Sequence, residues 1–478
     1  MISEDVLFAG IREIGAQLRA RRFSAVELAE LSLRRLETLG PSLGALVRVT
    51  RERAMREAHR ANQELFAGKD RGSLHGIPYG VKDLVATKGI ATSWGALPLR
   101  EQVLDYDATA VTRLEEAGAV MVAKLAMVEL AGGMGYNSPD ASFTGPGRTP
   151  WNTGYWSGGS SSGSAGAVAA GLVPFAIGSE TSGSILTPAA FCGVTGLRPS
   201  YGLVPRHGAM ALAWTLDKLG PLARSVDDCA IVLAAIAGPD PKDPTTTGDL
   251  FRPKAPAERP PRRFRVGVLR HATLGTDADV ESAFKQALGS LADVADLEED
   301  VALPDLPYGD AVRLIVAAEG AAALRELVES GRVKELQDRS DRVRGFARLL
   351  TPAVDYIDAM RARVAMRAEL DALLSRYDAL AAPTRTRLAP PIGQDFDAPT
   401  PGSPPQPEPR PGAPRPPATI PAGNLAGLPA LALPMGFGRD GLPVSLQLLG
   451  RAFSEATLVA LGTAYQQVTD WHRKRPPA

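Results

Sequence analysis

Serine and glycine residues gather in two short segments whose residue types could support nucleophilic catalysis. The first segment, residues 157–164, has the sequence SGGSSSGS, and the second, residues 178–184, has the sequence GSETSGS. A serine hydroxyl is a weak nucleophile unless a base removes its proton. The five histidines of the chain are scattered, and no His–Asp pair accompanies either segment. The sequence therefore disfavours a catalytic triad built on histidine.

Two interpretations without catalysis compete for the same residues. Flexible linkers are rich in glycine and serine, but here an apolar run at residues 172–177, which we expect to be a buried strand, separates the two segments. A phosphate-binding loop would carry the pattern G-x-x-x-x-G-K-[ST], and no lysine follows either segment closely. The residues alone disfavour both alternatives but leave them open.

One catalytic alternative places the nucleophile in the first segment. Residues 159–163 match G-x-S-x-G, the nucleophile elbow of α/β-hydrolases, with Ser161 at its centre. That motif needs a strand before the serine, whereas residues 150–154 are typical of a turn. It also needs a late histidine, and His472 lies in a terminal segment that we expect to be solvated. We therefore expect Ser161 not to be the nucleophile.

Three motifs in a fixed order resemble the amidase signature family of hydrolases. Residues 76–83, GIPYGVKD, resemble the lysine motif of that family, and the two serine–glycine segments resemble its G-G-S-S-x-G and G-S-I motifs. The similarity continues through residues 191–199, 220–225 and 424–429, and so spans nearly the whole chain. The resemblance implies an α/β fold, with residues 1–478 in one large domain whose mixed central sheet is covered by helices on both faces.

The resemblance also implies roles for individual residues. Ser184 matches the nucleophile of the family, Ser160 matches a bridging serine held by a cis peptide bond, and Lys82 matches the base. A buried lysine can act as a base because desolvation lowers its pKa. Backbone N–H groups before the nucleophile match the oxyanion hole, which in this chain comprises Thr181, Ser182, Gly183 and Ser184. An amide, or a related carbamate or ester, would then be cleaved through an acyl-enzyme.

Three positions depart from the pattern of the family. Glu180 stands where Asp is usual, Ser182 where Gly is usual, and Leu186 where Arg is common. Leu186 follows the nucleophile by two residues, so we expect its side chain or its neighbours to lie near the substrate. An arginine could pair with a substrate carboxylate in a bidentate fork, and a leucine cannot. This departure predicts a neutral, partly apolar substrate such as an aryl amide or a urethane.

Local patterns predict several helices around these motifs. Ser24 and Glu27 form a capping box, which predicts a helix at residues 25–39. A second helix is expected at about 47–67. A third is expected at 353–376, where apolar residues recur at helical spacing, and we interpret this stripe as core packing. The stripe consists of Val354, Ile357, Met360 and Val364.

The domain divides into three parts in this interpretation. The signature core covers about residues 70–235, and a helical middle section covers about 275–376. Residues 389–421 carry thirteen prolines and are expected to form a loop. A linker is one explanation for such a stretch. A lid over the mouth of the active site is the other, because long irregular loops in compact domains are often functional.

Composition narrows the expected partners and location. Lys+Arg and Asp+Glu are equal at 53 each, so no global charge favours nucleic acid or anionic lipid. Two cysteines are too few for a disulfide framework, and no apolar run is long enough to span a membrane. We expect a cytoplasmic monomer or homodimer that acts on a small molecule, binds no nucleic acid and needs no metal or organic cofactor.

Two alternatives to a self-sufficient amidase remain. One is the glutamine-amidase subunit of a tRNA-dependent amidotransferase, which belongs to the same family and works inside a complex; Leu186 argues against this role. The other is a catalytically inactive binding protein on the same fold, and the presence of Lys82, Ser160 and Ser184 argues against it.

Overall fold

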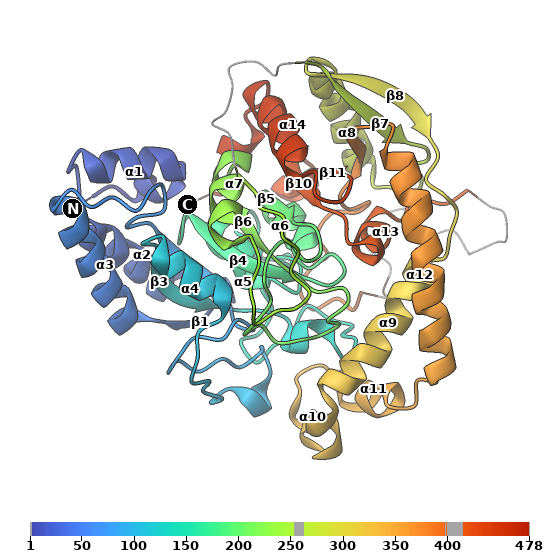
Figure 1. The fold of residues 1–478 in the computed structure, drawn as a ribbon, viewed down its shortest axis with the longest axis horizontal. Helices are drawn as coiled ribbons and strands as arrows, with labels where there is room; N and C mark the ends of the chain where they lie inside the picture. The colour runs from blue at the N-terminus through green and yellow to red at the C-terminus, as the bar shows by residue number, and fades with distance from the viewer. Residues whose placement is uncertain (1, 253–261, 397, 399–413, 478) are drawn as a thin grey trace.

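An eleven-stranded mixed sheet runs through the molecule, and the second serine–glycine segment, residues 178–184, begins within one of its strands (Figure 1). The computed structural model describes residues 2–252, 262–396, 398 and 414–477. The strand order is β1-β3-β2-β4-β6-β5-β10-β11-β9-β7-β8, and this sheet confirms the predicted α/β fold. The strands are β1 (Leu46–Val49), β2 (Pro78–Lys82), β3 (Val120–Leu125), β4 (Phe175–Glu180), β5 (Thr195–Arg198), β6 (Lys218–Ala223), β7 (Phe264–Leu269), β8 (Ala295–Val301), β9 (Ala379–Pro383), β10 (Ala430–Phe437) and β11 (Pro443–Leu449).

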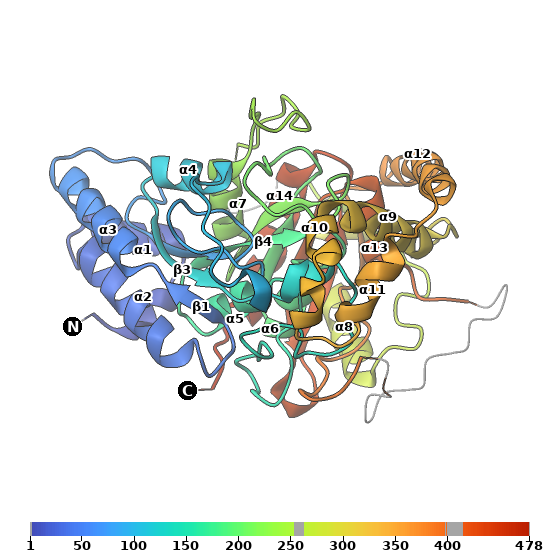
Figure 2. The same ribbon diagram turned by 90° about the horizontal axis from the view of Figure 1, so that it is seen from below.

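Helices cover both faces of this sheet, as predicted. In Figure 2, α5 and α6 lie below the central strands, whereas α4, α7 and α14 lie above them. The helices α9 to α12 gather at one side, next to α13. The α-helices of the described residues are α1 (Ile11–Arg19), α2 (Ala25–Leu39), α3 (Arg51–Phe66), α4 (Thr109–Glu116), α5 (Ser162–Ala169), α6 (Leu186–Cys192), α7 (Val226–Ile236), α8 (Ala278–Ala292), α9 (Tyr308–Ala323), α10 (Arg325–Glu329), α11 (Asp341–Arg348), α12 (Ala353–Leu374), α13 (Thr419–Ala426) and α14 (Glu455–Gln467).

Parallel pairing brings the lysine motif and the second serine–glycine segment to one edge of the sheet. Strand β2 is parallel to both β3 and β4, and Val81 faces Ile177 in the register of β2 and β4. Parallel neighbours end at the same edge, so Lys82, the last residue of β2, lies beside residues 178–180 at the end of β4. The topology thus explains how residues about a hundred positions apart can share a site.

Two local predictions concern the N-terminal region. The helix predicted at 25–39 is confirmed as α2, and both hydrogen bonds of the Ser24–Glu27 capping box are present. The prediction of a helix at 47–67 is wrong in its first turn, because residues 46–49 form β1 and the helix begins at Arg51. Strand β1 pairs antiparallel with β3, a partner some seventy residues away that local periodicity cannot reveal.

The strand expected at residues 172–177 is displaced along the chain. The N–H of Leu172 still donates to Ala167 O and closes α5, so the strand starts only at Phe175. It continues through Gly178 to Glu180 because each of these residues pairs with β6. The second serine–glycine segment is therefore partly strand, and it fixes Ser179 in the sheet.

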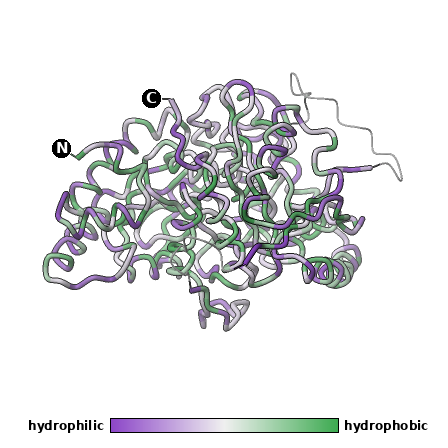
Figure 3. Tube along the Cα trace, turned by 90° about the horizontal axis from the view of Figure 1, so that it is seen from above, coloured by the Kyte–Doolittle hydropathy of each residue, from purple (hydrophilic) through white to green (hydrophobic). Residues whose placement is uncertain are grey.

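Three of the four residues in the apolar stripe of α12 do not pack in the core, which contradicts most of our prediction; Met360 alone of the four packs against the core. Val354, Ile357 and Val364 are 67%, 53% and 70% exposed. The buried face packs against α9 and α13 instead, and it includes Arg363, which donates to Leu425 O and Thr215 O. Both faces of α12 carry apolar residues at helical spacing, so periodicity alone could not show which face is buried. Figure 3 shows α12 at the lower right, with both hydrophobic and hydrophilic residues along it. The buried face consists of Ala359, Arg363, Met366, Leu370 and Leu374.

The proline-rich stretch is described only at its two ends. Helix α13 begins at Thr419, inside the loop expected to end at residue 421. Residues 397 and 399–413 lie outside the described residues, and so does most of the lid that we expected there. Within the described ranges, none of the helices has both the length and the apolar character that a membrane span requires.

Candidate active site

Lys82 lies fully buried at the end of β2, between two serines from different segments. Its Nζ donates to Ser160 Oγ at 2.7 Å and to Ser179 Oγ at 2.9 Å. The neighbouring carboxylate of Asp83 does not neutralise it. That carboxylate instead lies 3.5 Å from the Nζ of Lys124, a second buried lysine whose other contacts are to loop oxygens. The lysine of the motif thus faces hydroxyl groups and has no ion-pair partner in contact among the described residues.

Burial shifts the pKa of Lys82 towards neutrality. Desolvation penalises the ammonium form and lowers the pKa to about 7. The carboxylates of Asp217 and Glu180 act in the opposite direction, because nearby negative charge favours the protonated lysine. Desolvation is the larger effect. A large fraction of Lys82 is therefore neutral at neutral pH, which is the form that can accept a proton.

The two adjacent serines of the first segment differ in environment. Ser160 contacts Lys82, and the peptide bond between Gly159 and Ser160 is cis. Ser161 is fully buried, and its hydroxyl donates to Ser179 O at 3.2 Å and accepts from Ser179 N at 3.3 Å. Ser161 therefore ties α5 to β4. The elbow motif would need His472 as its base. The backbone oxygen of His472 accepts a hydrogen bond from Arg224, which follows the last residue of β6. The site lies at the other end of β6, where Lys218 is the first residue.

The turn before Ser184 presents backbone N–H donors beside the partly exposed nucleophile candidate. The N–H of Ser161 donates to Ser184 O at 3.2 Å, which fixes Ser184 next to Ser160. Gly183 has φ +90°, whereas Ser182 avoids positive φ, so the departure from glycine at 182 leaves the turn intact. Among the described residues, none accepts a hydrogen bond from the N–H groups of Ser182, Gly183 or Ser184.

Glu180 holds the start of α6 behind this turn. Its Oε2 accepts from the N–H groups of Ile185 and Leu186 at 2.8 and 2.9 Å. Its Oε1 accepts from Arg198 Nη1 and Asn424 Nδ2, and all these groups are buried. Leu186 itself is fully buried in the core. Substrate contact by Leu186 therefore stays a prediction, and its burial removes the main reason for expecting this residue to select a neutral substrate.

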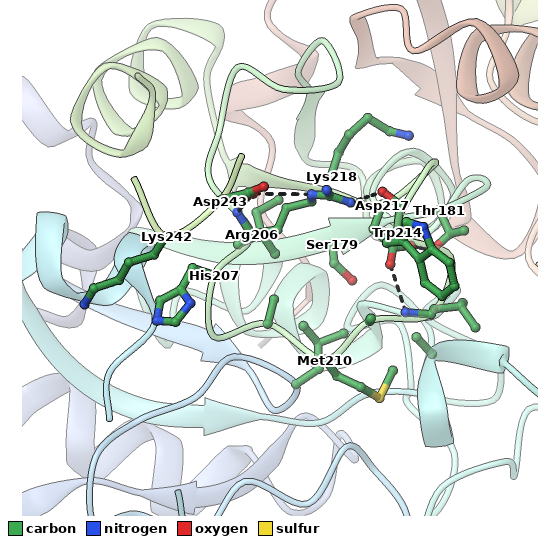
Figure 4. Close-up of a pocket in the computed structure, with 16 residues that line it drawn as sticks. Ser179, Thr181, Arg206, His207, Met210, Trp214, Asp217, Lys218, Lys242 and Asp243 are labelled. Atoms are coloured by element: carbon green, nitrogen blue, oxygen red, sulfur yellow. Dashed lines mark hydrogen bonds and ion pairs between the residues drawn. The ribbon is translucent and has the colours of Figure 1, made fainter. Parts of the chain in front are cut away.

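A cavity of about 190 Å³ reaches Ser179, one of the two serines that accept a hydrogen bond from Lys82 (Figure 4). Ser179, Thr181, Asp217 and Trp214 contribute to its lining. Asp217 accepts from Thr181 Oγ1 at 2.5 Å and from two backbone N–H groups of the 212–213 segment. One carboxylate thus braces the residue that follows β4, at the start of the expected oxyanion turn. The motif pattern gave no indication of Asp217, although it lies just before β6.

Aromatic residues line the other side of the first serine segment. A Cβ atom at Gly159 would lie 2.9 Å from the Trp156 ring and 3.2 Å from the Tyr136 hydroxyl, so both rings touch the residue before Ser160. Phe396 packs against both rings, with centroid distances of 4.6 and 5.6 Å. The guanidinium of Arg385, two residues beyond β9, interacts electrostatically with the phenol of Tyr136. Sequence reasoning missed these four residues; the position of Arg385 just after a strand was the one available signal.

No group of three or more His, Cys, Asp or Glu side chains in the described part of the chain is arranged to hold a metal ion. The site is thus made of serine hydroxyls, a buried lysine and backbone N–H groups. Such a set can generate a nucleophile, stabilise an oxyanion and return a proton to a leaving group. This is the chemistry that cleavage of an unactivated amide requires.

The chain belongs to the Amidase family, the amidase signature hydrolases, whose model matches residues 27–459. It is an enzyme that acts on amide C–N bonds. A relative from Roseiflexus sp. (strain RS-1), named as a subunit of Glutamyl-tRNA(Gln) amidotransferase, is 39% identical over 477 residues, covering 95% of each chain.

Solved structures support the same assignment. A chain from a complex described as vestigial, and as revealing the evolutionary origins of an s-triazine catabolic enzyme, superimposes with a TM-score of 0.86 at 30% identity, covering 98% of this chain and 100% of that one. Native peptide amidase from Stenotrophomonas maltophilia gives a TM-score of 0.81 at 32% identity, covering 98% of both chains.

These relatives contradict the partners that composition predicts. The prediction of a monomer or homodimer that acts on a small molecule without nucleic acid is wrong. The Roseiflexus protein is named as one subunit of an amidotransferase whose substrate is a tRNA. Zero net charge could not reveal this, since it describes the whole chain and not any one surface where a partner binds.

Proposed function

We propose that this enzyme cleaves an amide through an acyl-enzyme on Ser184, with Ser160 and Lys82 as the proton relay. The observation that carries the proposal is the 2.7 Å hydrogen bond from the buried Lys82 Nζ to Ser160 Oγ. Exposure falls along the relay: Ser184 is partly exposed, whereas Ser160 and Lys82 are buried. This order supports attack by the outermost group and storage of its proton by the innermost one.

The proton moves in two directions during one turnover. Neutral Lys82 takes the proton of Ser160 while Ser160 takes that of Ser184, whose oxygen bonds to the amide carbon. The relay then runs backwards and delivers the proton to the departing nitrogen. Water enters, loses its proton to the same relay, and attacks the acyl-enzyme to release the acid. Lys82 is protonated only until the proton returns, to the departing nitrogen in the first half-reaction and to Ser184 Oγ as its bond to the acyl carbon breaks in the second, so no lasting charge remains in the interior.

The oxyanion forms beside the turn at residues 182–184. Its three backbone N–H groups have no acceptor among the described residues, so they can donate without breaking an existing bond. Glu180 takes the next two N–H groups and Asp217 holds Thr181, and these contacts keep the turn in place. One donor of this kind lowers a barrier by about 3 kcal/mol.

We propose a primary carboxamide of the glutamine type as the substrate, cleaved to release ammonia within an assembly of several subunits. The relative named as an amidotransferase subunit, which matches 95% of this chain, supports this proposal. The test is ammonia release from L-glutamine by the purified chain, alone and co-purified with the partner subunits encoded by its host. We expect turnover that rises in the presence of partners. Failure to cleave glutamine in either form would contradict the proposal.

A neutral aryl amide or urethane is the second candidate, because Tyr136, Trp156 and Phe396 offer an apolar wall beside Ser160. An acetanilide and a phenyl carbamate, measured beside L-glutamine on the isolated chain, separate the two candidates. A kcat/KM at least tenfold higher for the aryl substrates would favour the second candidate.

The activity should follow the ionisation of Lys82. Its pKa is about 7, and only the neutral form accepts a proton, so kcat/KM is expected to rise with pH up to about 7 and then level off. Asp217→Asn removes a negative charge that raises this pKa, so the midpoint should move to lower pH. Asp243→Asn, which changes another carboxylate lining the same cavity, is the control and should leave the midpoint in place. A midpoint that moves upward in Asp217→Asn, or stays fixed, would contradict this account.

A further inference from the structure

Arg385 carries a positive charge that the described part of the protein does not neutralise. It lies two residues after β9, and none of the described residues forms a hydrogen bond or ion pair with its guanidinium. Its surroundings are otherwise well paired. Thr384 bonds to Ser445, and Arg376, at the opposite end of β9, pairs with Glu298 at 3.1 Å.

Arg385 is accessible to a molecule in solution. The side chain is solvent-exposed, yet surrounding protein lowers its pKa by desolvation. Protein thus packs close to part of a side chain that water still reaches. The phenol of Tyr136 interacts electrostatically with the guanidinium of Arg385.

Tyr136 connects this arginine to the catalytic segment. Its hydroxyl lies 3.2 Å from the Cβ position of Gly159, the residue linked to Ser160. Two backbone hydrogen bonds hold the chain after Arg385 against the same wall, from Trp156 N to Pro390 O and from Phe396 N to Asn137 O, both at 2.9 Å. The segment that follows Arg385 therefore runs along the aromatic residues beside Ser160.

We propose that Arg385 binds a carboxylate on the acyl part of the substrate, with Tyr136 beside it. This inference rests on the proposed function, in which the leaving group is ammonia, so that any carboxylate of the substrate belongs to the acyl part. A guanidinium presents a planar fork that matches a carboxylate, and a partly desolvated site strengthens the pair. Arg385 would thereby supply the charge recognition that Leu186, buried in the core, does not provide.

A matched pair of amides tests this role. Glutaramate carries a carboxylate at the end opposite to its amide, and valeramide is its neutral five-carbon counterpart. We expect the wild-type enzyme to prefer glutaramate, and Arg385→Gln to reduce that preference in kcat/KM by about tenfold to a hundredfold. Turnover of valeramide should stay within about twofold. Arg376→Gln removes the same charge at the far end of β9 and should keep the preference.

Binding of glutarate gives a second measurement that does not need turnover. We expect its Kd, measured by calorimetry, to rise by at least about tenfold in Arg385→Gln and to stay unchanged in Arg376→Gln. Equal affinity of the wild type and Arg385→Gln, or an unchanged substrate preference, would overturn the inference. If the wild type cleaves no amide but loses glutarate binding on substitution, the proposed function fails and the carboxylate site stands.

Discussion

Replacing Ser184 with alanine is expected to abolish turnover, lowering kcat by about 10⁴-fold or more. Ser184 is the partly exposed one of the three catalytic candidates, and it stands next to the N–H groups of residues 182–184, for which the described ranges contain no acceptor. No other group in the relay is accessible to a substrate carbonyl, so no acyl-enzyme can form without it. Steady-state kinetics and intact mass after reaction with a fluorophosphonate should both report the loss.

Ser161→Ala is the matched control, because Ser161 lies at the centre of the competing elbow motif. Its hydroxyl binds the backbone of Ser179, so the substitution should weaken the α5–β4 contact and leave substantial activity. An adduct on Ser161 would overturn the assignment of the nucleophile. A wild-type enzyme that stays unlabelled at Ser184 would contradict the assignment as well.

The site could be predicted to the extent that local motifs encode it. Lys82, Ser160 and Ser184 each lie in a short pattern, and the parallel pairing of β2 with β4 brings those patterns together. The aromatic wall and Arg385 could not be found in this way. They come from segments that reach Ser160 only through long-range contacts such as the Trp156–Pro390 hydrogen bond, which no local pattern records.

Leu186 and α12 show a second limit of sequence reasoning. Distance along the chain suggests that Leu186 lies near the substrate, but the residue begins α6, and the helix turns its side chain into the core. In α12, apolar residues at helical spacing occur on two faces, and contacts with α9 and α13 decide which is buried. In α12 the pattern identifies the helix correctly, while tertiary packing determines what each of its faces contacts.

Replacing Lys82 is expected to have the second large effect, a loss of kcat/KM of at least about a thousandfold. Lys82→Ala removes the base, and Lys82→Arg retains a cation that cannot lose its proton near neutral pH. Both should be inactive for the same reason, although arginine fills the space and alanine leaves a cavity. A purely structural role predicts the opposite, with arginine retaining much of the activity.

Three further measurements separate a relay from a loss of folding. Thermal unfolding of both Lys82 variants should show a cooperative transition. Lys124 is the neighbouring buried lysine and contacts loop oxygens. Lys124→Met should therefore lower Tm and leave kcat/KM within about tenfold of the wild type. The double variant Lys82→Ala/Ser160→Ala should be about as slow as either single variant, because groups that act as one relay lose their effect together. Additive losses in the double variant would mean that Lys82 and Ser160 act independently, and near-normal rates in Lys82→Arg would exclude lysine as the base.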